Sequence, residues 1–388
     1  MSDMNRKTRL KIIKNIQKNR DSKVITYLTS DRQGVHAQIG SDAIRPLYEH
    51  IKSWGFNGVP KIDLFLYSRG GGVEVPWPLI TMFREYCTEL NVLIPFRAHS
   101  ATTMISLGAD HIIMGKKGEL GPIDPQITKF RNDQAEPSEI LSVEDIMSYI
   151  SFIKDKAGLS DQDAISKQVS ILAEKMNPWS LGSMYRTYSH IRMTARKLLI
   201  SHKENIDERK IDAIIETLAE KTYFHGHSIG SGEAAEIGLP IIKADENLDG
   251  LMWALFVEYE KLLKLDEPLD SRSILPADKD ELDMPIYLAV IESEQGTDVF
   301  SGDFKIKRTR QFPSQINLNL NIPLQLPPNI DQQAIPAELN AQMQALLQNF
   351  QAQISQIVQT ELNKQAPLGK IEAGLFNASW KNVTELGI

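Results

Sequence analysis

Two short stretches of the sequence combine residue types that could perform acyl transfer. In "YSRGGG", Gly70 and Gly71 follow an apolar run that ends at Tyr67. Consecutive glycines let the backbone adopt positive φ angles and turn N–H groups into a cleft, where they could stabilise an oxyanion. In "AHSATT", Ser100 follows the next apolar run along the chain. A glycine turn and a serine at successive strand ends therefore predict oxyanion donors that flank a nucleophile.

Each stretch also has a purely structural interpretation. A glycine run can be a simple turn, and Ser100 can be the N-cap of a short buried helix. That helix is predicted from helical spacing of Ala101, Met104, Ile105 and Gly108. The same position suits a nucleophile, because the first N–H groups of a helix, chiefly that of Ala101, and the helix dipole favour negative charge. We expect Ser100 to be both cap and nucleophile.

The elements around these stretches follow an alternating pattern. Apolar runs rich in β-branched residues predict strands at 23–29, 61–68, 91–96 and 111–115. Helices are predicted between them, over 41–54, over 79–90 and from Ser100 onward. Alternating strands and helices indicate a parallel α/β sheet with right-handed crossovers. A series of further helices is predicted to end near Leu265.

The composition is that of a globular protein, with 42% hydrophobic and 24% charged residues in 388. A formal net charge of -7 argues against a protein that binds nucleic acid along its whole length. The single cysteine, Cys87, excludes an intramolecular disulfide framework and a cysteine-based zinc cluster. No GxxxxGK[ST] motif is present, so we expect no ATPase activity of the chain's own. Nothing in the sequence suggests a nucleotide, a metal or another cofactor.

The sequence carries no signal for membrane insertion or export. It has no apolar run of about 18 residues, and the basic N-terminus lacks the apolar core of a signal peptide. We therefore expect a cytoplasmic protein. Residues 1–20 are predicted to form a basic, solvated helix, and contact of this helix with anionic lipid is the less favoured interpretation.

Four regions are predicted along the chain. The basic helix at 1–20 precedes an α/β domain at 21–265, and a polar, proline-containing linker follows at 266–284. Residues 285–388 combine two strands around a glycine-containing turn with a glutamine-rich amphipathic helix. A helix with an apolar stripe needs a surface to cover it. This last region is therefore predicted to mediate self-association or to bind a partner protein.

Four segments together resemble the Clp/crotonase superfamily of serine peptidases, and within it most closely the serine dehydrogenase proteinase family, relatives of signal peptide peptidase A. The segments are "DLFLYSRGGGVEV", "AHSATTMISLGADHIIMG", "ELGPIDPQI" and "FHGHSIGSGEAAEIGLPI". The resemblance covers roughly residues 10–265. Two positions depart from it: Thr102 and Thr103 stand where many relatives have smaller residues, and Tyr67-Ser68-Arg69 stands where the family often has His-Thr-Pro.

The resemblance implies a Clp/crotonase-like fold of stacked ββα units, here with a helical extension and a separate C-terminal α+β tail. It implies Ser100 as the nucleophile, with oxyanion amides from Gly70 or Gly71 and from Ala101. It also implies assembly into rings or dimers, hence a homo-oligomer. The implied substrate is a peptide or protein, which would bind extended along residues 73–76 and add a strand by main-chain hydrogen bonds.

The general base stays open between several residues, because a serine hydroxyl needs a partner to accept its proton. By resemblance, Asp124 lies near the family's histidine position and His225 near its acid position, so the triad Ser100, His225 and Asp124 would have acid and base exchanged. His227 is an alternative to His225. A Ser–Lys dyad would instead use a desolvated lysine. The candidates for it are Lys154, Lys156 and Lys167.

The remaining polar residues near Ser100 are predicted to line a substrate cleft. His99 is adjacent to the nucleophile and is expected to contact substrate or to support the site from behind. Arg69 and Arg97 follow strand ends and could bind a peptide carboxylate or carbonyl. Each arginine could equally be an exposed loop charge.

The sequence thus predicts a serine endopeptidase that acts through an acyl-enzyme on Ser100. Two other functions stay possible at this point. A crotonase-like acyl-CoA enzyme would use the same pair of amides on a thioester, but without a serine nucleophile. A scaffold protein with a decayed site would act through its C-terminal helix.

Overall fold

The protein is described by a computed structural model that covers nine stretches of the chain. They are residues 6–55, 58–123, 126–130, 137–175, 178–221, 226–276, 278–310, 336–365 and 368–384. The chain forms two compact units. The first comprises Met1–Leu269, Pro285–Gly302 and Asn377–Ile388, and the second comprises Asp270–Met284 and Asp303–Phe376.

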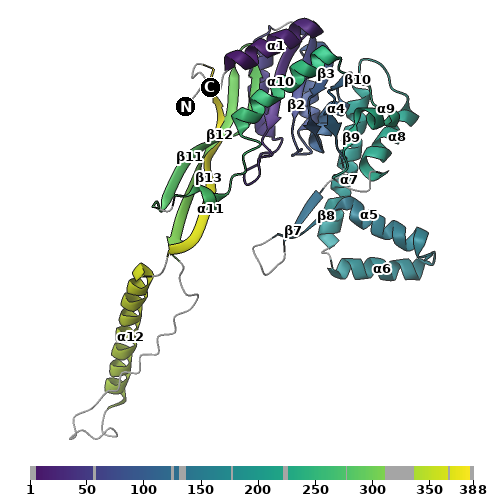
Figure 1. Ribbon diagram of the computed structural model, residues 1–388. Coiled ribbons are helices and arrows are strands. Elements are labelled where there is room, and N and C mark those ends of the chain that lie inside the picture. The colour runs from purple at the N-terminus through teal and green to yellow at the C-terminus, as the bar shows by residue number, and fades with distance from the viewer. Residues whose placement is uncertain are drawn as a thin grey trace. The chain divides into compact units, whose positions relative to one another are not determined.

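A parallel sheet forms the centre of the first unit (Figure 1). Its strands are β1 (Lys23–Thr29), β2 (Val59–Tyr67), β3 (Cys87–Ile94), β5 (His111–Met114) and β10 (Ile241–Lys243). They lie in the order β10-β5-β3-β2-β1, and each neighbouring pair is parallel. The α/β class predicted from alternating strands and helices is confirmed.

Helices cover both faces of this sheet. On one face pack α2 (Ile44–Lys52), which follows a 3-10 turn (Ser41–Ala43), α3 (Pro76–Arg84), α4 (Ala101–Leu107) and α7 (Pro178–Ile200). On the other pack α1 (Arg6–Arg20) and α10 (Glu246–Leu263). Successive side chains of a strand point to opposite faces, so Leu64 and Leu66 join the first core and Phe65 the second.

The N-terminal helix differs from its prediction as a solvated element. Ile13 and Ile16 of α1 are fully buried. The Arg9 side chain is only 1% exposed, and its Nε lies 2.7 Å from Glu292 Oε2. The helix is buried because its apolar stripe covers the second core beside α10.

The predicted helix over 79–90 is shorter than expected. Helix α3 ends at Arg84, and β3 begins at Cys87 after a tight turn closed by the Tyr86 N–H on the Phe83 carbonyl. The helical spacing of Tyr86, Cys87 and Leu90 is therefore coincidental. Cys87 is partly buried, and burial raises the pKa of its thiol to about 12.

A small sheet lies at the carboxyl end of the central strands. Its strands are β4 (Arg97–Ala98), β6 (Glu119–Leu120) and β9 (Ile229–Gly230), in the order β4-β6-β9. Helix α9 (Ser231–Ile237) follows β9. In this sheet β6 pairs on one side with β4, which leads to Ser100, and on the other with β9, a segment from far downstream in the sequence.

Further helices and a hairpin fill the chain between β6 and β9. The hairpin is β7 (Gln126–Phe130) with β8 (Pro137–Ser142). The helical elements are α5 (Val143–Ser151), a π-helix (Phe152–Lys156), α6 (Gln162–Lys175), α8 (Glu208–Glu216) and a second π-helix (Thr217–Lys221). No helix in the described stretches has the length and apolar character needed to cross a bilayer.

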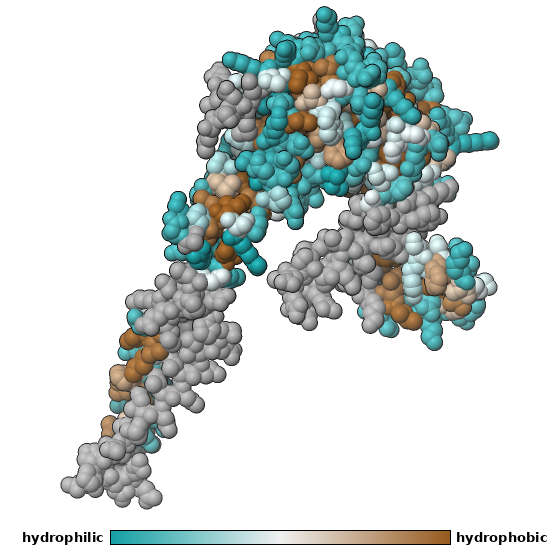
Figure 2. Space-filling view, viewed as in Figure 1, coloured by the Kyte–Doolittle hydropathy of each residue, from teal (hydrophilic) through white to brown (hydrophobic). Residues whose placement is uncertain are grey.

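The C-terminal region contains both predicted strands and the predicted glutamine-rich helix. Its elements are α11 (Ser271–Ile274), β11 (Glu281–Ser293), β12 (Thr297–Arg310), α12 (Ala337–Gln365) and β13 (Leu368–Asn382). Leu346, Phe350 and Ile357 of α12 are more than half exposed, and apolar patches are visible along this helix (Figure 2).

The compact units do not follow the boundaries expected from the sequence. Residues 285–302 belong to the first unit, because β11 pairs antiparallel with β1, from Ile25 opposite Ser293 to Thr29 opposite Ala289. This pairing occupies the sheet edge at β1. Composition indicated a polar linker before residue 285 but carried no information about which edge the following strand joins.

Candidate active site

Ser100 lies between β4 and α4 in an uncommon backbone conformation. Its φ is 52° and its ψ is -118°. A residue with a side chain is strained there, and such strain persists only where the surrounding structure enforces it. Ser100 occupies the N-cap position of α4, but its side chain makes no capping hydrogen bond. The expected capping bond is therefore not made by the hydroxyl group.

The glycine turn lies directly against Ser100. Gly70 has a φ of 112°, and a Cβ atom added there would come within 2.7 Å of Ser100 Cβ and 3.2 Å of Ser100 Oγ. The turn is held by Ile39, whose N–H donates to the Gly70 carbonyl (2.8 Å) and whose carbonyl accepts the Gly72 N–H (2.9 Å). The absence of a side chain at Gly70 is therefore what permits this close approach.

The backbone amides of this region differ in their availability. The Gly70 N–H donates to Ser68 Oγ at 3.1 Å. Within the described stretches, the N–H groups of Gly71 and Ala101 donate to no protein acceptor. Of the two glycines predicted as alternatives, Gly71 therefore has the N–H that is left for a ligand.

Thr103, which stands where many relatives have a smaller residue, uses its hydroxyl in hydrogen bonds within the protein. Its hydroxyl lies 2.7 Å from the Ala98 carbonyl, and it accepts the Gly121 N–H at 3.1 Å. Thr102 and Thr103 are both fully buried. The second threonine thus joins the start of α4 to the chain after β6, and neither side chain is exposed beside Ser100.

A cleft of about 840 Å³ contains Ser100 and the glycine turn. Its wall includes Arg69, His36 and the segment 70–74, with Ser183 and Thr187 contributed by α7. His36 and Asp31, which also lines the cleft, were not among the residues predicted from the sequence. Both residues follow the carboxyl end of β1. Because ligands of parallel sheets bind at the carboxyl ends of the strands, this position in the sequence could have identified them as candidate site residues.

The two predicted cleft arginines have different surroundings. Arg69 lines the cleft, with a side chain that is 52% exposed, and its Nε donates to Asp31 Oδ2 at 2.9 Å. Arg97 is not among the residues of the cleft wall. Its guanidinium lies 3.3 Å from Asp31 and 3.4 Å from Glu119, over the ring of Phe96. Arg97 is therefore committed to other side chains of the protein.

Asp31 is held as a carboxylate by these neighbours. Burial opposes its ionisation, but hydrogen bonds from the Tyr67 hydroxyl (2.7 Å) and from Arg69 keep its pKa below the ordinary value. The charge of Arg97 acts in the same direction. A charged Asp31 in turn keeps both guanidinium groups in place.

His99 points away from the cleft wall and toward Glu119. Its Nε2 lies 3.1 Å from Glu119 Oε1, and the other oxygen of Glu119 accepts the Ser228 hydroxyl at 2.5 Å. Burial lowers the pKa of His99, although the Glu119 charge opposes this effect. Because a carboxylate oxygen can only accept, the Nε2–H of His99 donates to Glu119.

The structure describes only some of the candidate general bases. Asp124 and His225 lie outside the described residues. His227 is 41% exposed and its Nε2 lies 2.7 Å from Glu233. The three candidate lysines are exposed and do not line the cleft with Ser100; they are Lys154, Lys156 and Lys167. None of these three lysines is therefore placed at the cleft where it could accept the proton of Ser100.

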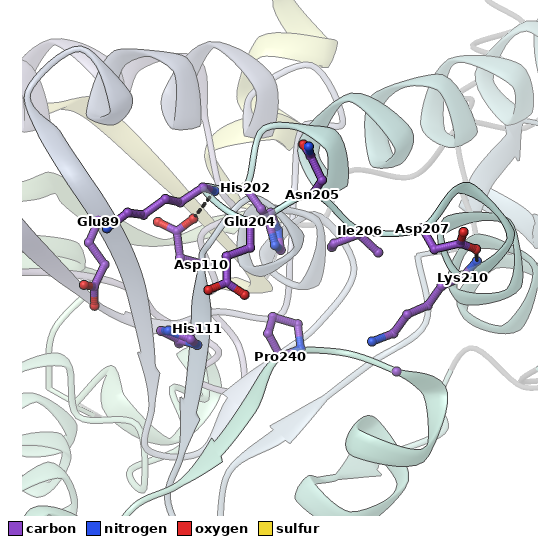
Figure 3. Close-up of a pocket in the computed structure, with 12 residues that line it drawn as sticks. Glu89, Asp110, His111, His202, Glu204, Asn205, Ile206, Asp207, Lys210 and Pro240 are labelled. Atoms are coloured by element: carbon purple, nitrogen blue, oxygen red, sulfur yellow. Dashed lines mark hydrogen bonds between the residues drawn. The ribbon is translucent and has the colours of Figure 1, made fainter.

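A second cleft, of about 440 Å³, lies at the other end of α4 (Figure 3). Asp110, His111 and Glu204 surround it, and none of the residues predicted from the sequence lines it. His202 Nε2 donates to the Leu107 carbonyl at 2.6 Å. Arg84 donates to the Gly108 carbonyl at 2.8 Å. These two side chains hold the carboxyl end of the helix that begins after Ser100.

Arg84 and Asp110 form a paired contact that we expect to stabilise the fold measurably. Arg84 approaches both oxygens of Asp110, at 2.9 and 3.1 Å, and the two side chains are 17% and 7% exposed. Arg84→Ala would leave Asp110 without its counter-charge, which costs about 3 kcal/mol. Chemical denaturation at neutral pH measures this loss. Lys261→Ala, which breaks an exposed pair with Glu258, is the control and should cost under about 1 kcal/mol.

The effect of Arg84→Ala should also depend on pH. Burial opposes ionisation of Asp110, but Arg84 and the N–H groups of Lys203 and Leu90 hold its pKa below the ordinary value. A carboxyl with a lowered folded pKa stabilises the protein above its unfolded pKa, and this contribution disappears as pH falls through the folded pKa. The difference between Arg84→Ala and wild type should therefore shrink below pH 4. An equal difference at pH 3 and pH 7 would contradict this assignment.

Residues 1–146 match the family described as ClpP-like SDH-type serine proteinase, which confirms the resemblance predicted from the sequence. The glycine turn and Ser100 both lie within the matched segment. The β9 segment and the C-terminal strands lie beyond it.

Two relatives come from Methanocaldococcus jannaschii, and both are uncharacterized proteins. One is 27% identical over 265 residues, which is 65% of this chain and 79% of that protein. The other is 29% identical over 132 residues, 31% of this chain and 43% of that protein. Among solved structures, a serine-to-alanine mutant of the 1510-N membrane-bound stomatin-specific protease matches with a TM-score of 0.35 and 16% identity, over 58% of this chain and 83% of that one.

Proposed function

We propose that the protein is a serine endopeptidase whose acyl-enzyme forms on Ser100. One observation carries this proposal: Ser100 has a strained backbone, an uncommitted hydroxyl, and the glycine turn against it at the wall of a cleft. A serine that served only as a helix cap would use its hydroxyl on the helix N–H groups and would not require strain.

In the proposed mechanism, Ser100 Oγ attacks the substrate carbonyl and forms a tetrahedral intermediate. The N–H groups of Gly71 and Ala101 receive the oxyanion, since neither donates elsewhere among the described residues. Collapse of the intermediate expels the amine, which takes a proton, and leaves an ester on Ser100. Water then hydrolyses the ester and restores the hydroxyl.

For the proton of Ser100, we propose the pair of His225 as base and Asp124 as its carboxylate partner. The support is indirect. Ser228, three positions after His225, donates to Glu119, and the β4-β6-β9 sheet joins the same segment to the strand before Ser100. The described residues that follow His225 in the sequence therefore belong to the same small sheet as the strand before Ser100.

The substrate is proposed to be an extended peptide in the cleft beside residues 73–76. Val73 and Glu74 line this cleft, and Arg69 has terminal N–H groups at its wall that could bind a backbone carbonyl or a carboxylate. A homo-oligomer is also proposed, and the exposed apolar residues of α12 are where we expect a further copy or a partner protein to bind.

A fluorophosphonate probe, which reacts with activated serines, tests the proposal on the full-length protein. We expect wild type to be labelled and Ser100→Ala to be unlabelled. Ser189→Ala, an exposed serine of α7 outside the cleft, should label like wild type. His225→Ala and Asp124→Asn should label at least about 100-fold more slowly, the range that a general base contributes.

Two results would contradict the proposal. Labelling that persists in Ser100→Ala would place the reactive serine elsewhere. Folded wild type that neither labels nor cleaves an unstructured protein substrate would favour the scaffold function. Loss of labelling in Ser100→Ala alone, with His225→Ala and Asp124→Asn labelled like wild type, would keep the nucleophile and reject the exchanged triad.

A further inference from the structure

A continuous network of ion pairs connects the wall of the cleft with the small sheet β4-β6-β9. It begins at Arg69, which precedes the glycine turn and pairs with Asp31 at 2.9 Å. Arg97 lies between two carboxylates, with one nitrogen 3.3 Å from Asp31 and another 3.4 Å from Glu119. The network ends where Glu119 accepts the Ser228 hydroxyl at 2.5 Å. It thereby connects segments that are far apart in the sequence.

Within this network of described residues, Arg97 is the member that contacts both carboxylates, those of Asp31 and Glu119. Its planar guanidinium presents several N–H donors in a fixed fork, so it can serve two carboxylates at once. The same group lies 4.1 Å from the ring centre of Phe96, which fixes its plane. Its side chain is 30% exposed, against 13% for Asp31 and 22% for Glu119. These partly buried charges balance, with two arginines against two carboxylates.

The backbone alone ties these segments together only weakly. Strands β4, β6 and β9 have two residues each, and β9 pairs only with β6 among the described strands. Sheets of such length contribute few main-chain hydrogen bonds. The Glu119–Ser228 bond is therefore a substantial part of what holds the segment 226–230 beside β6, the strand that pairs with β4.

We propose that Arg97 and Glu119 are positioning residues that hold the glycine turn and the segment 226–230 in register with Ser100. This inference rests on the proposed function, because it concerns the geometry around that nucleophile. It assigns Arg97 a role other than substrate binding: the guanidinium is engaged by Asp31, Glu119 and Phe96 and is not in the cleft wall. Arg69, by contrast, keeps terminal donors at the cleft.

The first test compares Arg97→Lys and Glu119→Gln with wild type in peptide hydrolysis and probe labelling. Lysine keeps the charge but cannot span two carboxylates, and glutamine keeps a hydrogen-bond acceptor for Ser228 but loses the charge. Displacement of reacting groups by about 1 Å costs on the order of 100-fold. We therefore expect kcat and the labelling rate to fall about 10- to 100-fold in both variants, with KM changed by less than about threefold.

Arg20→Lys is the matched control. Arg20 makes two hydrogen bonds to a single carboxylate, that of Asp63, at 2.8 and 3.2 Å, in the middle of β2 and away from the carboxyl ends of the strands that carry the site. This variant should keep the wild-type kcat within about twofold. An equal fall in kcat in Arg20→Lys and Arg97→Lys would assign the effect to general loss of stability and overturn the inference.

A second measurement separates this inference from the proposed function. Amide hydrogen exchange, followed in the Ser100→Ala background, does not depend on catalysis. Arg97→Lys should speed exchange in peptides that cover 69–74 and 226–230 together, while peptides from α10 stay protected. Coupled exchange in this background, together with a protein with Ser100 intact that does not react with the probe, would sustain the positioning role and reject the peptidase. Unchanged exchange with unchanged kcat would reject the positioning role and leave the peptidase intact.

Discussion

Gly70→Ala is expected to reduce fluorophosphonate labelling by at least about 100-fold while the protein stays folded. The φ of 112° at Gly70 is a conformation that a residue with a Cβ rarely adopts. The new methyl carbon would lie 2.7 Å from Ser100 Cβ and 3.0 Å from the His99 carbonyl oxygen. Neither atom belongs to the flexible end of a side chain, so Ser100 or the whole turn must move. Either displacement separates the nucleophile from the amides of Gly71 and Ala101.

The labelling rate and the thermal transition of Gly70→Ala should be measured on the same sample. Gly250→Ala is the control, because Gly250 lies inside α10 with no atom within 4 Å of an added Cβ. Alanine in a helix interior stabilises by roughly 0.5–1 kcal/mol relative to glycine, so this variant should label normally and melt slightly higher. Labelling of Gly70→Ala within threefold of wild type would show that the glycine turn does not contribute to the reactivity of Ser100.

Arg9→Met is expected to cause the largest loss of stability among the changes considered. Arg9 approaches both oxygens of Glu292, at 2.7 and 3.1 Å, and both side chains are 1% exposed. The Tyr259 hydroxyl also donates to Glu292 at 2.7 Å. Removing one partner of a buried pair leaves the other charge uncompensated, which costs about 3–5 kcal/mol. A free energy of this size is a large fraction of the stability of a typical domain.

Denaturant unfolding of Arg9→Met, Glu292→Leu and the double variant measures this effect. The double variant should recover much of the loss, because replacing a whole buried ion pair by apolar residues is often neutral. Lys264→Ala removes an exposed pair with Glu267 and should change the free energy of unfolding by less than about 1 kcal/mol. If Arg9→Met were as mild as Lys264→Ala, the helix would not be anchored by this pair.

The Arg9–Glu292 pair also illustrates the main difference between the predicted and the observed domain organisation. The two residues are 283 positions apart, in regions that the sequence assigned to a solvated helix and to a separate C-terminal tail. The surface that covers the apolar face of α1 is built from α10 and the strands of the sheet, most of which lie far from α1 in the sequence. Sequence spacing identifies an apolar face and not its partner.

The local features of the candidate site could be predicted well from the sequence. Glycine has a conformational range that no other residue shares, so a run of glycines after a strand already indicates an unusual turn. The position of Ser100 before a helix followed from the spacing of its apolar neighbours, and the α/β class followed from the alternation of strands and helices. These properties depend on residues that are close together in the chain.

The tertiary structure decided what depends on distant residues. The close contact between Ser100 and the Gly70 turn depends on the packing of two separate strand ends. The contacts of Arg97 likewise depend on Asp31 and Glu119, which lie on other segments of the fold. The same holds for His36, which reaches the cleft because Ile39 pairs with the glycine turn. The sequence by itself determined most of the strands and helices around the site and the nucleophile candidate, because local conformation and apolar spacing depend on neighbouring residues. Only the fold decided which charges meet, because an ion pair depends on the path of the chain between its partners.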